Sequence, residues 1–181
     1  MARCGSYRKG AEKLPFRGDL RILQTMLGYD YLWSLIRVKG GAYGCFGSFD
    51  NTGNASFASY RDPNLFETDE VFLGIPEYLA QFEVDERDMT KYIIGTISDI
   101  DTPMSPYAKG ERSMAALLRG TTVEEMQKMR DQVLDAELPD IRALAVYAKA
   151  ALADSYLCVV GSEQTIREHA DAFDEITSLL G

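Results

Sequence analysis

An arginine and a tyrosine stand six positions apart in the segment 36–44 (IRVKGGAYG), on either side of two adjacent glycines. An apolar helical pattern precedes the segment and a strand-like pattern follows it. Gly40 and Gly41 would therefore supply the positive φ angles that a tight helix exit needs. A chain that folds back here can aim the Arg37 guanidinium and the Tyr43 phenol at one point. Both groups are hydrogen-bond donors, which suits them to a carbonyl oxygen or a developing oxyanion.

The same residues also have ordinary structural interpretations. An arginine in the last turn of a helix often only complements the helix dipole. A tyrosine at the start of a strand is usually half-buried, with its hydroxyl satisfied. Two glycines after a helix are most often a C-cap. Residue types and spacing alone leave both the structural and the functional interpretation open.

Metal chemistry has few candidate ligands in this sequence. A catalytic zinc site needs three protein ligands, usually with histidine among them. The sequence contains one histidine, His169, and no His-x-x-Glu-His signature. We interpret His169, Glu168 and Asp171 as a solvated helix surface, and we expect no metal site and no cofactor in this chain.

Length and charge limit the class of protein and its partners. The 181 residues indicate one domain, residues 1–181, and the net charge of −9 argues against a nucleic-acid partner. No apolar run is long enough to cross a membrane, and the first residues lack the apolar stretch of a secretory signal. Three widely separated cysteines, Cys4, Cys45 and Cys158, favour a reducing, cytoplasmic location. The last two lie in strand-like runs and are predicted to be small core residues.

The apolar periodicity and the turn residues predict an alternation of strands and helices. We expect a first strand within 2–9, then an amphipathic helix that bends at Gly28 and delivers Arg37 to the bend. Ala42–Phe49 and Asn54–Tyr60 flank a turn-rich linker and predict a β-hairpin.

Helix signals dominate the rest of the chain. Further helices are predicted from Asp62-Pro63 to about Phe82, from Asp85 to before Thr102, from Ser105-Pro106, from the Thr122–Glu125 capping box, and from Leu138 to about Ala153. A strand at Tyr156–Val160 and a C-terminal helix follow. This order predicts an α+β domain in two layers, with a largely antiparallel sheet.

The strings Asp30–Trp33 and Ile36–Gly44 resemble the C-terminal half of the presequence-protease branch of pitrilysin-type (insulinase-type) zinc peptidases. Ser59–Asn64 and Ser105–Gly110 agree with the same family, and the similarity extends from about Gly18 to the end of the chain. Cys45 and the residue after it depart from the family, whose members often carry small residues there.

This resemblance implies a mitochondrial-processing-peptidase-like metallohydrolase domain with helices packed on one face of its sheet. It implies that Arg37 and Tyr43 reach the substrate carbonyl at the scissile bond, in a substrate-binding bend that includes Gly40 and Gly41. It also implies that zinc is bound by a separate N-terminal half of the same polypeptide, which closes over this half like a clamshell and encloses short, unstructured peptides.

Two hypotheses about function follow. In the first, the chain is the C-terminal, non-zinc domain of a zinc metalloendopeptidase and supplies Arg37 and Tyr43 to the substrate. In the second, it is a non-catalytic peptide-binding or assembly module of the same fold. Under both hypotheses the isolated chain is expected to be inactive as a peptidase, because the zinc motif is absent from it.

Overall fold

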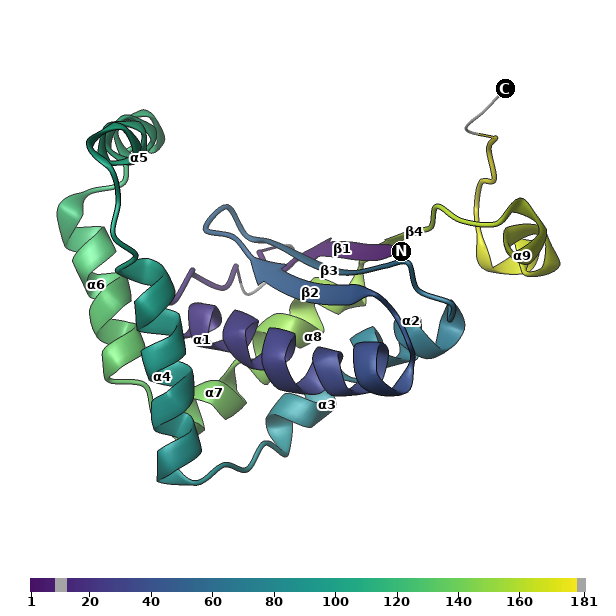
Figure 1. The fold of residues 1–181 in the computed structure, drawn as a ribbon, viewed down its shortest axis with the longest axis horizontal. Helices are drawn as coiled ribbons and strands as arrows, with labels where there is room; N and C mark the ends of the chain where they lie inside the picture. Colours follow the sequence, from purple (N-terminus) through teal and green to yellow (C-terminus); the bar gives the residue numbers. More distant parts are fainter. Residues whose placement is uncertain (9–12, 179–181) are drawn as a thin grey trace.

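The computed structural model describes residues 1–8 and 13–178, in which an antiparallel sheet lies against a layer of helices (Figure 1). The described strands are β1 (Ala2–Ser6), β2 (Gly44–Phe49), β3 (Asn54–Tyr60) and β4 (Tyr156–Cys158). Their order is β2-β3-β1-β4, and each neighbouring pair is antiparallel. The predicted α+β class and two-layer architecture are therefore confirmed. Part of the predicted first strand, residue 9, lies outside the described residues.

The first helix is the element that leads into the bend. α1 (Asp19–Met26) continues without a break into two π-helical segments, η1 (Leu27–Tyr31) and η2 (Trp33–Lys39). The remaining helices are α2 (Phe66–Leu73), α3 (Ile75–Ala80), α4 (Glu86–Ile100), α5 (Pro106–Arg119), α6 (Val123–Leu134), α7 (Leu138–Ala143), α8 (Ala145–Ala153), α9 (Glu163–Glu168) and the 3-10 turn η3 (Ala170–Ala172).

The change of winding occurs where the sequence predicts a bend, beside Gly28. Leu27 and Leu32 are both fully buried although they stand five positions apart. The i→i+5 hydrogen-bonding pattern of a π-helix brings residues at this spacing toward one side of the axis, whereas an α-helix would turn them apart. The wider winding therefore keeps both side chains in the core before the chain reaches Arg37.

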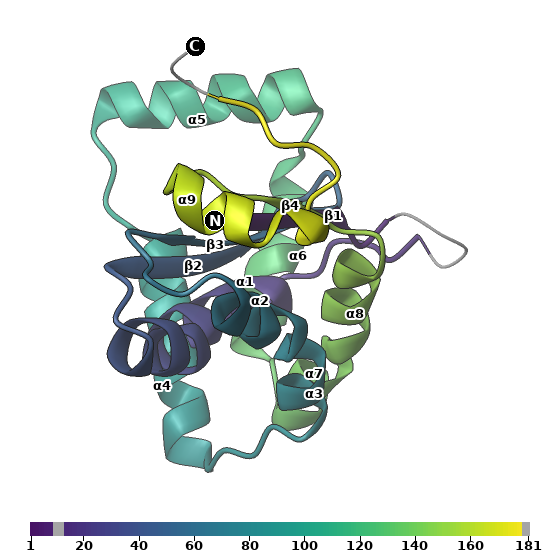
Figure 2. The same ribbon diagram turned by 90° about the vertical axis from the view of Figure 1, so that its right-hand side faces the viewer.

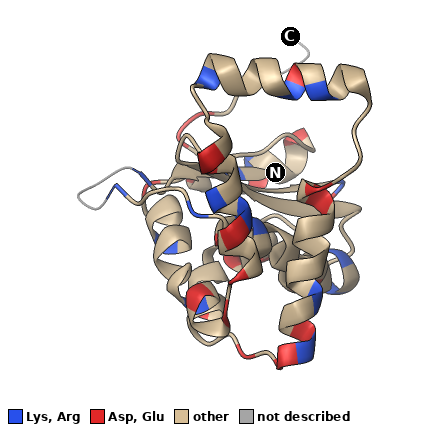
Figure 3. Cartoon of the chain, turned by 90° about the vertical axis from the view of Figure 1, so that its left-hand side faces the viewer, with Lys and Arg blue, Asp and Glu red and all other residues tan. Residues whose placement is uncertain are grey.

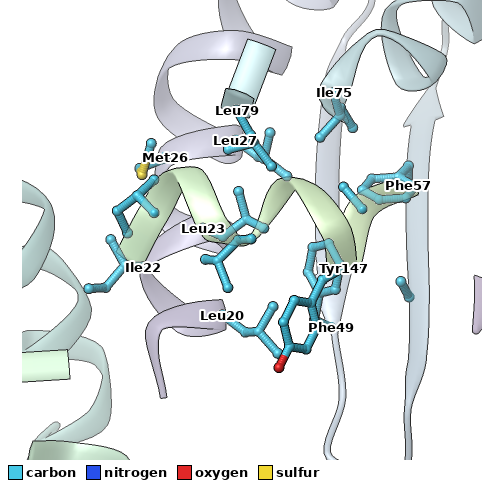
Figure 4. Packing of buried hydrophobic residues seen from close by; sticks show 14 of the residues in the cluster. Leu20, Ile22, Leu23, Met26, Leu27, Phe49, Phe57, Ile75, Leu79 and Tyr147 are labelled. Atoms are coloured by element: carbon cyan, nitrogen blue, oxygen red, sulfur yellow. The ribbon is translucent and has the colours of Figure 1, made fainter. Parts of the chain in front are cut away.

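α1 is the centre of the hydrophobic core (Figure 4). It contacts β2 on one side and α4, α6 and α7 on others, so its side chains are buried on more than one face. Leu20, Ile22, Leu23 and Met26 are all 0% exposed. Because the helix that carries the bend begins in this core, the position of its C-terminal end is set by close packing.

Helices cover one face of the sheet, as the family resemblance implies. α1 and the π segments contact β2, and α8 contacts β1 and β3 (Figure 1). Phe49 and Phe57 point into this layer and are buried. Phe46 and Cys158 lie on the opposite face and are exposed. The prediction that Cys158 is a core residue is therefore wrong, since β4 directs its thiol away from the helices.

Helices that begin at a side-chain cap start where the sequence predicts them. The Asp85 side chain accepts from the Asp88 N–H at 2.8 Å, and the Ser105 side chain accepts from the Ala108 N–H at 3.2 Å. Thr122 also forms the predicted capping box. Each cap satisfies a backbone donor that the first turn of a helix leaves unpaired. Because the capping side chain and the donor lie within four residues of each other, the sequence alone predicts the cap.

Two helix predictions needed correction. Asp62 and Pro63 do not start a helix, because the Asp62 carboxylate accepts from the Asn64 N–H at 3.0 Å and from the Thr68 hydroxyl at 2.8 Å. These bonds form a turn, and the helix begins only at Phe66. The predicted long helices to Phe82 and from Leu138 to Ala153 are each divided, at Gly74 and at Leu144.

Burial of Tyr7 makes the free energy of unfolding depend on pH in the alkaline range. Tyr7 is fully buried, its ring lies 5.5 Å from that of Tyr147, and its hydroxyl donates to the backbone oxygen of Asp50. Burial raises the pKa of Tyr7 to about 12 from an ordinary value near 10. Because the folded-state pKa is the higher one, this contribution to stability is complete below about pH 10 and is lost as the pH rises toward 12.

We therefore expect the free energy of unfolding in urea to decrease between about pH 10 and pH 12. Tyr7→Phe removes the titrating group, so its free energy of unfolding should decrease less over the same interval. An equal decrease in both proteins would assign the alkaline transition to other residues.

Candidate functional site

The bend after the first helix is built from three backbone hydrogen bonds. The N–H of Gly40 donates to Leu35 at 3.0 Å, that of Gly41 to Arg37 at 3.1 Å, and that of Ala42 to Ile36 at 3.1 Å. Gly41 has a φ of +79°, which favours glycine. Gly40 has a φ of −79°, so the expectation of positive φ at both glycines is correct only for Gly41.

Gly40 is required for a different reason, namely close approach. A Cβ at this position would lie 2.6 Å from the Ile36 carbonyl oxygen and 3.2 Å from Nδ2 of Asn64. The same Asn64 amide donates to the Gly40 carbonyl oxygen at 2.6 Å. Asn64 thus ties the bend to the segment after β3, and there is no room for a side chain between them.

The structure brings Arg37 and Tyr43 together across this bend. The Arg37 guanidinium carbon lies 5.7 Å from the centroid of the Tyr43 ring, and Nη1 of Arg37 donates to the Tyr43 backbone oxygen. Arg37 is half-buried, while Tyr43 is 55% exposed. The two side chains therefore lie side by side at the surface.

Cations and aromatic rings alternate around Arg37 and Tyr43. The other members of this group are Trp33, Arg61 and Tyr60. The Arg37 guanidinium carbon lies 4.3 Å from the Trp33 ring centroid, within the range of a cation–π contact. The Arg61 guanidinium carbon lies 5.4 Å from the Tyr43 centroid, and the Tyr60 ring lies edge-on to Tyr43 at 5.4 Å.

The sequence analysis did not single out these three residues. Trp33 and Arg37 are four positions apart on one helical segment, and that spacing was a usable signal. Arg61 carried no such signal. It reaches the site because β3 pairs with β2, and because its backbone oxygen accepts from the Tyr43 N–H at 3.2 Å.

The site is electropositive within an acidic chain. Among the described residues, no carboxylate forms an ion pair with Arg37, Lys39 or Arg61. Burial raises the pKa of the Cys45 thiol, and the positive charge of Arg37 lowers it in part. The arrangement can bind an electron-rich oxygen, because it offers guanidinium N–H groups beside a phenol that is open to solvent.

The described residues do not fit a zinc ion. Within 1–8 and 13–178 no three His, Cys, Asp or Glu side chains gather closely enough to hold a metal. His169 is exposed at the end of α9, and its ring lies 4.7 Å from that of Phe66 in an edge-on contact. In the described part of the chain, no helix is both long and apolar enough to span a membrane.

A surface hollow is present elsewhere in the described structure. It has a volume of about 690 Å³ and is lined by residues of α6 together with Arg17, Asp135 and Asp140. Neither Arg37 nor Tyr43 lines it. The two side chains instead lie on an open surface, where a ligand would have to be enclosed by something other than this domain.

Comparison with known proteins identifies the family. The profile of the family described as "PreP C-terminal domain" matches residues 3–175. The protein HypA of Clostridium perfringens is 43% identical over 180 residues, which is 99% of this chain and 18% of that protein. Presequence protease 1 of Arabidopsis thaliana, described as chloroplastic/mitochondrial, is 40% identical over 71% of this chain and 12% of its own length.

A solved structure agrees with the fold. A crystal structure from Bordetella parapertussis, described as the inactive peptidase domain of a candidate zinc protease, has a TM-score of 0.66 and 18% identity, and covers 90% of this chain and 91% of that one. The chain spans less than a fifth of the length of the two curated relatives above. Since the family profile covers nearly the whole sequence, the chain belongs to the family of presequence-protease (PreP) C-terminal domains.

Proposed function

We propose that this domain contributes substrate contacts to a zinc metalloendopeptidase that degrades short, unstructured peptides. Arg37 and Tyr43 would bind the carbonyl oxygen at the scissile bond, and the bend at Gly40 and Gly41 would shape the surface beside them. The observation that carries the proposal is the placement of a half-buried guanidinium within 5.7 Å of an exposed tyrosine ring.

The contacts of Arg37 account for how it would act. Trp33 stacks on the guanidinium and the Tyr43 carbonyl accepts one of its N–H groups, so the side chain is held before a substrate arrives. A guanidinium has five N–H donors, and no second hydrogen-bond acceptor for Arg37 is present among the described residues. The remaining donors can stabilise the negative charge that develops on a carbonyl oxygen, without the cost of reorganisation.

The zinc would belong to another part of the polypeptide. The described residues of this chain do not fit it, and the relatives that match this chain are several times longer. We propose that a zinc-binding N-terminal half of the same polypeptide closes over this domain and encloses the substrate. A cytoplasmic, reducing location also stays a prediction. It rests on three free cysteines, and several relatives are named as mitochondrial.

One observation favours a second candidate, a peptide-binding or assembly module without a catalytic role. The described residues contain no group of three or more potential metal ligands. In that case the positive surface around Tyr43 would bind peptides without affecting turnover.

Tyr43→Phe in a full-length protease that carries this domain separates the two candidates. The change removes only a hydroxyl, so we expect kcat for a short fluorogenic peptide to decrease about tenfold, the equivalent of one hydrogen bond of about 1.4 kcal/mol. Tyr60→Phe is the matched control, because Tyr60 is 50% exposed beside the same ring and has no assigned role. Equal kcat values in both variants and the parent enzyme would favour the non-catalytic module.

A further inference from the structure

Arg61 is an exposed residue whose backbone has a left-handed conformation. It directly follows β3, and its φ of +48° is one that glycine and asparagine adopt more readily than arginine. Figure 2 faces the side of the domain where η2 ends, β2 begins and β3 leads into α2. There the Arg61 backbone oxygen accepts from the Tyr43 N–H at 3.2 Å. An arginine in a conformation that costs it free energy indicates a use for its side chain.

The Arg61 guanidinium has no acidic partner among the described residues. Its carbon lies 5.4 Å from the centroid of the Tyr43 ring, and no hydrogen bond or ion pair joins the group to another residue of the described part of the chain. The neighbouring Asp62 carboxylate is already occupied by the Asn64 N–H and the Thr68 hydroxyl. The N–H donors of the Arg61 guanidinium are therefore open to a ligand.

Cations on the other side of the domain are arranged differently. Acidic and basic residues lie next to each other along α4 and α6, on the side opposite to the bend (Figure 3). Lys91 of α4 forms an ion pair with Asp88, and Arg130 of α6 forms one with Asp101. Arg61 keeps its charge unpaired in a chain with a net charge of −9. Such a guanidinium is the kind of group that an anionic ligand neutralises.

Arg61 and Arg37 lie beside one aromatic ring. Their guanidinium carbons are 5.4 Å and 5.7 Å from the Tyr43 centroid. An extended peptide advances about 3.3 Å per residue, so a peptide whose carbonyl oxygen contacts Arg37 can place a group within about three residues of that carbonyl at Arg61. A guanidinium binds a carboxylate through two parallel hydrogen bonds and binds a neutral amide less strongly. Arg61 can therefore distinguish peptides by their charge close to the reacting bond.

We infer that Arg61 is a specificity-determining residue, which binds a carboxylate of the peptide within about three residues of the carbonyl held by Arg37. That carboxylate is a glutamate or aspartate side chain, or the free C-terminus of a short peptide. The inference rests on the proposed function only in placing a peptide carbonyl at Arg37.

The test measures binding without catalysis. The Kd of labelled short alanine-serine peptides is measured for a full-length protease that carries this domain, with EDTA present to prevent cleavage. One series places a single glutamate or glutamine at each position in turn and has an amidated C-terminus. The other series has neither residue and ends in a free carboxyl or an amide. In at least one series, we expect a charged peptide to bind about tenfold more tightly than its neutral match, and the ratio to decrease at high salt.

Arg61→Gln should reduce this ratio to about one. Lys39→Gln is the matched control, because Lys39 is a second exposed cation at the bend; its ratio should stay within twofold of the parental one. Arg61→Asn also removes the charge but tolerates a positive φ, so a loss of preference in both neutral variants cannot come from backbone strain. Arg61→Lys should retain part of the preference, since it keeps the charge without the planar group.

Four results would overturn the inference. They are equal Kd values for charged and neutral peptides in the parent protein, a ratio that Arg61→Gln leaves intact, the same loss of ratio in Arg61→Gln and Lys39→Gln, or an equal weakening of charged and neutral peptides by Arg61→Gln. The third would assign the preference to the general positive charge of the bend, and the fourth would make Arg61 only a support for the Tyr43 ring.

The outcomes for the inference and for the proposed function are separable. If Arg61→Gln abolishes the preference while Arg37→Ala keeps the parental kcat, the specificity inference stands and the proposed function fails. If the parent shows no preference while Arg37→Ala loses turnover, the inference fails and the proposed function stands.

Discussion

Replacing Arg37 with alanine in a full-length protease that carries this domain is expected to lower kcat by about 10²–10³, the usual effect of removing one donor to an oxyanion. The loss should be in kcat and kcat/KM together, because a contact that forms fully only in the transition state contributes little to substrate binding. Arg37→Lys keeps a positive charge but loses the planar group that stacks on Trp33 and bonds the Tyr43 carbonyl. The kcat of Arg37→Lys should lie between that of the parent enzyme and that of Arg37→Ala.

Lys39→Ala is the control for this experiment. Lys39 carries the same charge two residues later, on the same helical turn, and is exposed. If positive charge near the bend were sufficient, both alanine variants would lose activity equally. If Arg37 acts through its held position, only the Arg37 variants should change, and a parental kcat in Arg37→Ala would remove the residue from the reaction.

The largest effect on stability is expected for Phe57→Ala. Phe57 is 1% exposed at the centre of β3, and its ring lies 5.7 Å from that of Phe49 and 6.1 Å from that of Phe72. Truncating a buried phenylalanine loses its burial and leaves a cavity, which costs about 3–5 kcal/mol of unfolding free energy. Urea unfolding monitored by circular dichroism measures this difference.

The neighbouring strand offers a control of the same residue type. Phe46 lies on the opposite face of the sheet and is 50% exposed, so Phe46→Ala should cost less than about 1 kcal/mol. Similar losses in the two variants would mean that the outer face of the sheet is covered in solution, which would contradict the two-layer arrangement.

Sequence reasoning succeeded where the signal is local. The caps at Asp85, Ser105 and Thr122 and the hairpin of β2 and β3 each depend on residues a few positions apart. It failed at Asp62-Pro63, where the expected cap forms a turn instead, since one carboxylate can satisfy either a helix start or a turn. The exposure of Cys158 was equally unpredictable, because a three-residue strand has no alternation to indicate its buried face.

The sequence by itself determined that an arginine and a tyrosine flank a glycine bend between a helix and a strand, since those relations are contained in nine consecutive residues. Only the tertiary structure decided how the bend is used. The Asn64 amide bonds the Gly40 carbonyl, Gly41 has the positive φ, and strand pairing brings Arg61 to the ring of Tyr43. These relations join residues about 20 positions apart, and close packing selects among conformations that local propensity leaves nearly equal in free energy.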